Sequence, residues 1–89
     1  MSQGLKPLVG PQIRAARALL GWSAENLYRH SSVSVRTIRR AEMFEAKTSL
    51  TAPNELAVRR ALEAAGVEFI DEKGGGPGVR LRKRQQKKY

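Results

Sequence analysis

Three arginines, Arg36, Arg39 and Arg40, lie within five residues near the middle of the sequence. A guanidinium group carries several N–H donors in a planar fork, so it can bind a carboxylate, a phosphate or the O6 and N7 acceptors of guanine through two hydrogen bonds. Ser34 comes two residues before Arg36 and is a favourable N-cap, so these arginines are expected near the start of a helix. What they can bind depends on which face of that helix they share.

The spacing of these residues predicts a helix with one basic face and one apolar face. If the first helical residue is the reference and each residue adds about 100°, the three arginines lie between about 40° and 140°. Ile38 and Ala41 lie between about 240° and 300° on the same scale. We therefore predict a helix from Val35 to about Glu45, whose apolar face packs on a core while the arginines point outward.

Apolar spacing and helix-breaking residues predict the remaining elements. We expect helices over Pro11–Leu20, from an N-cap at Ser23 to about Ser31, and from Thr51 or Ala52 to just before Gly66. In the last of these, the apolar stripe is predicted to be Val58, Ala61, Leu62 and Ala65, and Arg59 is predicted to face outward. Residues 11–83 then form one domain, with a loose arm over 1–10 and a basic tail over 84–89.

A β-hairpin is expected over residues 67–83, because two alternating segments flank a run of glycine and proline. Pairing about Gly75 would place Phe69 opposite Leu81 and Glu68 opposite Arg82. An isolated two-stranded hairpin is marginal in water, so this one must pack on the helices or on another chain. The expected fold is therefore mainly α, with four helices and a C-terminal two-stranded antiparallel hairpin.

Composition narrows the class of partner. The chain has 89 residues and a formal net charge of +9, which favours a polyanionic partner such as nucleic acid. It has no cysteine and one histidine, so neither a disulfide, a thiolate zinc site nor another metal site is expected. No catalytic constellation is visible, so we expect neither an enzyme nor a cofactor, and no small-molecule ligand is evident. With no membrane-spanning run and no signal peptide, a cytoplasmic protein is expected.

The segment from residue 23 to residue 42 has the spacing of a helix-turn-helix. Two short helices are joined by a tight turn, and apolar residues stand at Leu27, Val33, Ile38 and Ala41. In such a motif the second helix can lie in the major groove of DNA. Here the second helix would be the one that carries the three arginines.

Four segments resemble the Cro and phage-repressor, or Xre-like, family of bacterial helix-turn-helix regulators: "IRAARALLGWS", "VSVRTIRRAE", "VRRALEAAGVEFID" and "GGGPGVRLRKR". The resemblance runs from about Gln12 to Arg84. The similar subgroup has four helices and ends in a glycine-rich hairpin. The resemblance implies sequence-specific binding of double-stranded DNA, usually as a homodimer at an inverted repeat and usually for transcriptional repression.

The resemblance also implies roles for single residues. The family's base-reading positions fall on Val35, Arg36 and Arg40, while Ser34, Thr37 and Arg39 fall where backbone or flanking contacts are common. We also expect backbone contacts from Ser23 and Lys47. The hairpin is the expected homodimer contact, through Phe69 and Leu81.

Three positions depart from the family pattern. Ala24 stands where a glutamine is common in the family, which contacts a phosphate or braces the recognition helix, so that contact is missing. Ser32 stands at a turn position often filled by glycine and must accept a left-handed conformation or change the turn. Tyr28 occupies a position that is usually small; either the helix crossing adjusts, or the side chain points outward toward a phosphate.

Two other functions remain open at this stage. The protein could bind nucleic acid non-specifically as an architectural protein, through its basic tail. It could instead be a protein-interaction module, such as an antitoxin-like or co-regulator subunit, whose hairpin binds a different chain. If substituting the arginines abolishes base preference, the protein is a sequence-specific DNA-binding protein and not a non-specific one. Measurement of its molecular mass in solution would test the protein-interaction alternative.

Overall fold

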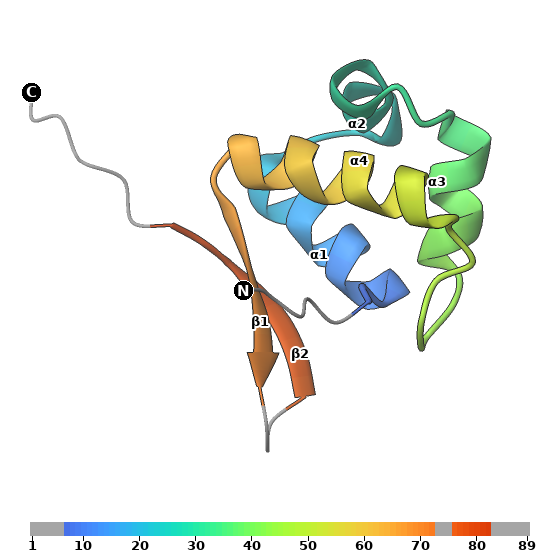
Figure 1. Ribbon diagram of the computed structural model, residues 1–89. Coiled ribbons are helices and arrows are strands. Elements are labelled where there is room, and N and C mark those ends of the chain that lie inside the picture. Colours follow the sequence, from blue (N-terminus) through green and yellow to red (C-terminus); the bar gives the residue numbers. More distant parts are fainter. Residues whose placement is uncertain (1–6, 73–75, 83–89) are drawn as a thin grey trace, which may run out of the picture.

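Four helices precede one antiparallel hairpin in the computed structural model, which describes residues 7–72 and 76–82. The helices are α1 (Gly10–Leu20), α2 (Ala24–Ser31), α3 (Val35–Glu42) and α4 (Ala52–Ala64), and the strands are β1 (Val67–Glu72) and β2 (Gly76–Leu81) (Figure 1). The predicted mainly α fold with a two-stranded hairpin is confirmed. The predicted tail, residues 84–89, lies outside the described residues.

Local side-chain chemistry explains where most of the helices begin and end. Ser23, Ser34 and Thr51 each accept a hydrogen bond from the backbone N–H three residues later, at 3.0, 3.1 and 3.3 Å. These caps satisfy N–H groups that have no partner inside the helix. At the other end of α1, Gly21 has a φ of 70°, a left-handed conformation that glycine adopts without strain. The predicted boundaries of α1, α2 and α4 are therefore confirmed to within a residue.

Helix α3 is shorter than predicted, because it ends at Glu42 and not near Glu45. The backbone of Gly10 packs directly against carbonyl groups at the end of α3 and just beyond it: a Cβ on Gly10 would lie 2.8 Å from the oxygen of Ala41 and 2.1 Å from that of Phe44. The Phe44 N–H bonds to the Ala41 oxygen at 3.2 Å, which tightens the last turn. The start of α1 thus occupies the space into which α3 would continue.

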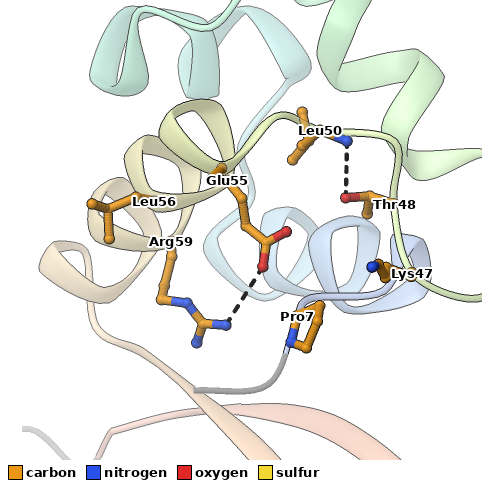
Figure 2. A pocket seen from close by; sticks show the side chains of 8 residues that line it. Pro7, Lys47, Thr48, Leu50, Glu55, Leu56 and Arg59 are labelled. Carbon is orange, nitrogen blue, oxygen red and sulfur yellow. Dashed lines mark hydrogen bonds and ion pairs between the residues drawn. The ribbon is translucent and has the colours of Figure 1, made fainter. Parts of the chain in front are cut away.

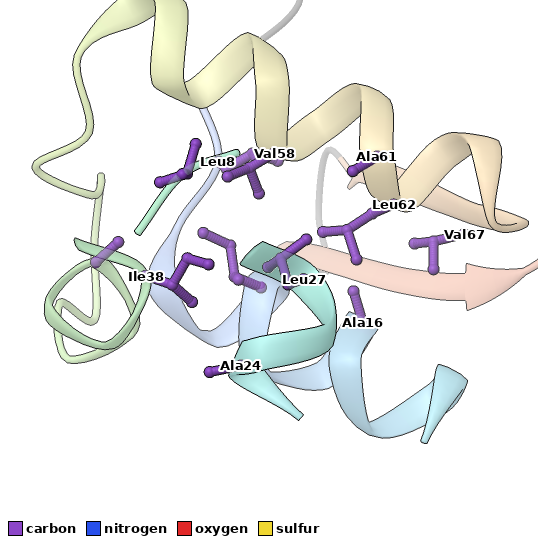
Figure 3. Close-up of a cluster of buried hydrophobic side chains, with 12 residues drawn as sticks. Leu8, Ala16, Ala24, Leu27, Ile38, Val58, Ala61, Leu62 and Val67 are labelled. Atoms are coloured by element: carbon purple, nitrogen blue, oxygen red, sulfur yellow. The ribbon is translucent and has the colours of Figure 1, made fainter. Parts of the chain in front are cut away.

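One cluster of buried apolar side chains joins all four helices to the first strand (Figure 3). Its members are Leu8, Ile13, Ala16, Ala24, Leu27, Val33, Ile38, Ala41, Val58, Ala61, Leu62 and Val67. Three of the four residues predicted for the stripe of α4 are in it, and the fourth, Ala65, is half-buried. Each helix therefore contributes the face that its apolar spacing predicts.

The last residues of the predicted loose arm belong to the fold. Leu8 is only 1% exposed. Its N–H donates to Glu55 Oε2 at 2.9 Å, and its carbonyl accepts the Thr48 N–H at 3.3 Å. The prediction of a loose arm is thus wrong from Leu8 to Gly10, where backbone hydrogen bonds and burial hold the chain, and residues 1–6 lie outside the described residues.

The hairpin register differs from the predicted one by two residues. Phe69 pairs with Val79, and Glu68 pairs with Arg80, instead of with Leu81 and Arg82. The prediction was wrong because it assigned Pro77 and Gly78 to the turn, whereas β2 begins at Gly76. A shift of two residues keeps every side chain on its predicted face.

The apolar face of the hairpin packs on the protein's own helices. Val67 is fully buried, and Phe69 and Val79 pack against the core cluster. Gln12 of α1 donates through Nε2 to the Gly78 oxygen at 3.1 Å, and the Arg82 N–H bonds to the Gly66 oxygen at 2.7 Å. These contacts supply the support that an isolated hairpin lacks.

Arg59 is 6% exposed, so the prediction that it faces outward is wrong. Its guanidinium carbon lies 5.3 Å from the ring centroid of Phe69, and its Nη2 lies 4.0 Å from Glu55 Oε2. The hairpin folds back over this side of α4 and covers it. A pattern read within one helix cannot reveal a face that a later element covers.

Candidate nucleic-acid interface

The outer face of α3 carries the three arginines of the sequence pattern. Arg36, Arg39 and Arg40 are all exposed, whereas Ile38 is 1% exposed and Ala41 is fully buried. The predicted separation of a basic face from an apolar face is therefore confirmed for this helix. Burial of the apolar face holds the arginines toward solvent.

No intramolecular acceptor occupies these guanidinium groups in the part of the chain that the structure describes. Within it, Arg36, Arg39 and Arg40 make no hydrogen bond or ion pair through their side chains. The acid within α3, Glu42, is turned inward and is 6% exposed. The outer face of α3 is thus uniformly positive, and its donors are free to bind acceptors on another molecule.

An inward ion pair holds the C-terminal end of α3. The carboxylate of Glu42 accepts two hydrogen bonds from Arg17 of α1, from Nε at 2.7 Å and from Nη2 at 2.8 Å. A third donor of Arg17, Nη1, reaches the carbonyl oxygen of Trp22 at 3.0 Å, between α1 and α2. The hydrogen bond with Glu42 raises the pKa of Arg17 above its ordinary value. One arginine thus ties α3 to the α1–α2 junction.

Two further contacts fix α3 from behind. Arg14 donates through Nη1 to the carbonyl oxygen of Glu42, and the backbone of Gly10 abuts the last carbonyl groups of α3. The positive N-terminal end of α1 therefore meets the negative C-terminal end of α3, an arrangement that the helix dipoles favour. These contacts set the angle at which α3 presents its outer face.

Sequence reasoning missed this anchor. Glu42 lies at about 340° on the helical scale that placed the arginines, which is nearer to Ile38 at about 300° than to any of the three arginines. That angle was the one indication in the sequence that Glu42 points inward. The partner on α1, 25 residues earlier in the chain, is a matter of tertiary structure.

The other predicted contact residues differ in their exposure and in their intramolecular hydrogen bonds. Val35 is half-buried and packs against the core, because it lies between the apolar face and the basic face of α3. The hydroxyl of Ser34 donates to Thr37 Oγ1 at 2.9 Å while its oxygen caps α3. Ser23 is exposed, and both its oxygen and its N–H are used in the cap of α2. Lys47 is exposed in the loop before α4.

The segment that joins α2 to α3 adopts the turn that the sequence made questionable. Ser32 has a φ of 66° and a ψ of 14°, and its N–H bonds to the Tyr28 oxygen at 2.7 Å. A left-handed conformation costs a non-glycine residue about 1 to 2 kcal/mol. Ala24 is buried in the core, and the Tyr28 side chain is 45% exposed. Tyr28 therefore points outward, one of its two predicted orientations.

The aromatic and basic side chains before and at the end of α2 stack on each other. The rings of Trp22 and His30 lie 4.4 Å apart between centroids and 19° from parallel. His30 Nδ1 lies 2.9 Å from the carbonyl oxygen of Asn26, so Nδ1 is the donor. The imidazole ring thus covers one face of the partly buried indole.

A pocket of about 400 Å³ lies between the N-terminal segment, the loop before α4 and α4 itself (Figure 2). Three of the polar residues in its lining, Thr48, Glu55 and Arg59, interact within the chain. Glu55 accepts the Leu8 N–H and lies 4.0 Å from Arg59, and Thr48 Oγ1 accepts the Leu50 N–H at 3.3 Å. The pocket is therefore a junction that holds the N-terminal segment on α4.

The two residues predicted for a homodimer contact have different surroundings. Phe69 is half-buried and packs on Arg59 of its own chain. Leu81 is 46% exposed, near the end of β2. Phe69 thus already has an intramolecular partner, while much of Leu81 remains open to another molecule.

Comparison with known proteins adds no family assignment: no family model matches the chain, and no curated protein matches it significantly. Among the described residues, no helix has the length and apolar character needed to cross a bilayer. Over the same ranges, no three His, Cys, Asp or Glu side chains come together as metal ligands would. The arginine face of α3 is therefore the feature on which a function is argued.

Proposed function

We propose that this protein binds double-stranded DNA sequence-specifically, with α3 in the major groove. The observation that supports it is the outer face of α3. It carries three exposed arginines that have no acceptor among the described residues, on a helix held from behind by Arg17 and Glu42. In this proposal α2 and α3 are a helix-turn-helix, and α3 is its recognition helix. The fixed position of α3 matters because a base contact requires a defined position of the guanidinium group.

The three arginines take two roles in the proposed complex. Arg36 and Arg40 read guanine through bidentate hydrogen bonds to O6 and N7, each worth about 1 to 3 kcal/mol of discrimination. Arg39, at the edge of the arc, contacts a flanking phosphate together with Lys47. Val35 contributes a smaller apolar contact with a thymine methyl group, because it is half-buried.

The proposed biological role is transcriptional repression by a homodimer at an inverted repeat. A two-fold dimer sets two recognition helices about 34 Å apart, so that each reads one half-site on the same side of the duplex. Bound across a promoter element, such a dimer represses by occupying the site. We expect it to act in the cytoplasm, on the chromosome.

Selection of bound sites from random duplex DNA tests this function most broadly. The expected result is an inverted repeat with guanine at fixed positions in each half-site. Arg36→Ala and Arg40→Ala should each relax the preference at one of these positions, by about 5-fold to 150-fold in relative affinity. A pool that shows no enrichment with the wild-type protein would contradict the proposal.

Two control variants separate base reading from general attraction to the backbone. Arg60→Ala removes an exposed arginine from α4, away from the outer face of α3, and should leave base preference unchanged. Deletion of residues 84–89 should weaken all duplexes alike, with a smaller dependence of affinity on salt. If the deletion abolishes binding while Arg36→Ala and Arg40→Ala change no preference, the protein is a non-specific binder.

A further inference from the structure

Met43, the residue that follows α3, has the most exposed large apolar side chain among the described residues. It is 75% exposed, whereas the next two, Leu81 and Tyr28, are 46% and 45% exposed. Methionine is a residue type that folded chains usually bury. The fold of this chain alone thus makes little use of the Met43 side chain.

The position of Met43 continues the basic face of α3. Its backbone is still helical, with a φ of −80° and a ψ of −15°, and its N–H bonds to the Arg40 oxygen at 3.2 Å. On the scale that places the arginines between about 40° and 140°, Met43 lies at about 80°. A tighter last turn, with three residues per turn, changes this angle by only about 20°. Met43 therefore lies in the middle of the arginine arc, one turn beyond Arg39 and Arg40.

The backbone is held on both sides of Met43. Before it, the carboxylate of Glu42 accepts two hydrogen bonds from Arg17. After it, the carbonyl group of Phe44 packs on the backbone of Gly10, where a Cβ would lie 2.1 Å from the Phe44 oxygen. Met43 is thus presented from a fixed position, as the arginines are, and a specific contact requires such a position.

The major groove of DNA offers an apolar group to such a side chain, the C5 methyl group of thymine. The unbranched and polarisable side chain of Met43 can pack on this methyl group while the neighbouring guanidinium groups bind acceptors. At 1.5 Å per residue, Met43 lies about 4.5 Å beyond Arg40 and about 10.5 Å beyond Arg36 along the helix axis. Successive base pairs are about 3.4 Å apart, so these distances correspond to about one and three base pairs.

We propose that Met43 is a further base-reading residue, which packs on the methyl group of a thymine about one base pair beyond the guanine read by Arg40. The inference rests on the proposed function, which places α3 in the major groove. It adds an A·T pair to each half-site and extends the reading surface past the end of α3. This contact is separate from that of Val35, which lies eight residues earlier, at the start of α3.

Replacement of thymine by uracil tests this contact, because uracil lacks only the C5 methyl group. The duplex carries the sequence selected by the wild-type protein, and the thymines of one half-site, on either strand, are replaced one at a time. The quantity measured is the thymine/uracil ratio, which is the affinity for the original duplex divided by that for the replaced one. We expect a ratio of about 4 for the wild-type protein at the thymine next to the guanine of Arg40, the value of about one buried methyl group. The same ratio should fall to about one for Met43→Ala, which lacks the packing group.

Three comparisons show whether the effect belongs to Met43. Met43→Leu retains an apolar side chain and should retain the wild-type thymine/uracil ratio. Leu56→Ala is the matched control, because Leu56 is an apolar residue of α4 that is 43% exposed, and it should leave the ratio unchanged. A thymine read by Val35 should keep its ratio in the Met43→Ala protein. Circular dichroism shows whether each variant is folded.

The outcomes separate this contact from the proposed function. If Met43→Ala has the wild-type ratio at every thymine, or if the wild-type ratio is near one at every thymine, the contact at Met43 is overturned. The proposed function is tested by the guanine positions that depend on Arg36 and Arg40. If these guanines depend on the arginines while no thymine depends on Met43, only the Met43 contact fails, whereas a selection without enrichment overturns both.

Discussion

Replacing Glu42 by glutamine tests the claim that α3 is held from behind. The substitution keeps the size of the side chain and removes the charge that receives two hydrogen bonds from Arg17, at 2.7 and 2.8 Å. Arg17 then keeps its hydrogen bond to the Trp22 oxygen but loses its carboxylate partner. We expect the free energy of unfolding to fall, because a partly buried guanidinium is left without a counter-charge.

The size of the loss follows from the burial of the two side chains. Removing one member of a fully buried ion pair costs about 3 to 5 kcal/mol. The Glu42 side chain is 7% exposed but that of Arg17 is 22% exposed, so water partly stabilises the unpaired guanidinium. We therefore expect a loss of about 2 to 3 kcal/mol, discounted from the fully buried case. For a domain of this size, this corresponds to a fall of roughly 10 to 20 °C in Tm.

Urea unfolding followed by circular dichroism measures this loss, with a midpoint shift of about 2 M expected. Glu45→Gln is the matched control, because Glu45 is exposed just beyond the end of α3. It should change the free energy of unfolding by less than about 0.5 kcal/mol. If Glu42→Gln lowered the free energy of unfolding no more than Glu45→Gln does, the ion pair would not hold α3 in position, and the claim that α3 is held from behind would fail.

Three further predictions concern the backbone and the hairpin. Gly10→Ala should destabilise the fold by about 2 kcal/mol or more in thermal unfolding, because its Cβ would lie 2.1 Å from a carbonyl oxygen; an unchanged Tm would show that the contact is looser. Ser32→Gly should stabilise it by about 0.5 to 1 kcal/mol, by relieving the left-handed strain at φ 66°, and a loss of stability would refute that strain. Glu68 accepts a hydrogen bond from Arg80 at 2.9 Å, which lowers the pKa of Glu68. The stabilisation that this ion pair gives the hairpin is therefore fully present above the ordinary glutamate pKa, and it is lost as the pH falls through the lowered pKa. An NMR titration should show this pKa rising in an Arg80→Gln variant, and an unchanged value would contradict the assignment.

Features of local origin could be predicted from the sequence. The caps at Ser23, Ser34 and Thr51 and the two faces of α3 are set within one turn of helix, where side-chain type and spacing decide the outcome. The hairpin faces could also be predicted, because alternation survives a register error of two residues. The exposed arginine face belongs to this class.

Features that depend on distant segments could not be predicted. The inward orientation of Arg59 depends on Phe69 folding over it, and the end of α3 depends on Gly10. The ion pair that mounts α3 joins residues on different helices, and no local pattern specifies such a pair. The candidate surface was therefore visible in the sequence, whereas the contacts that position it were not.

The central claim is that the α3 arginines read bases, and competition binding at one salt concentration tests it most directly. The affinity for the selected inverted repeat is compared with that for a scrambled duplex of the same composition, for the wild-type protein and for Arg36→Ala/Arg40→Ala. We predict a ratio of about 1,000 or more for the wild-type protein, and a reduction of at least ~10-fold in that ratio for the double variant. A ratio near one for the wild-type protein, or the same ratio for both proteins, would contradict the claim.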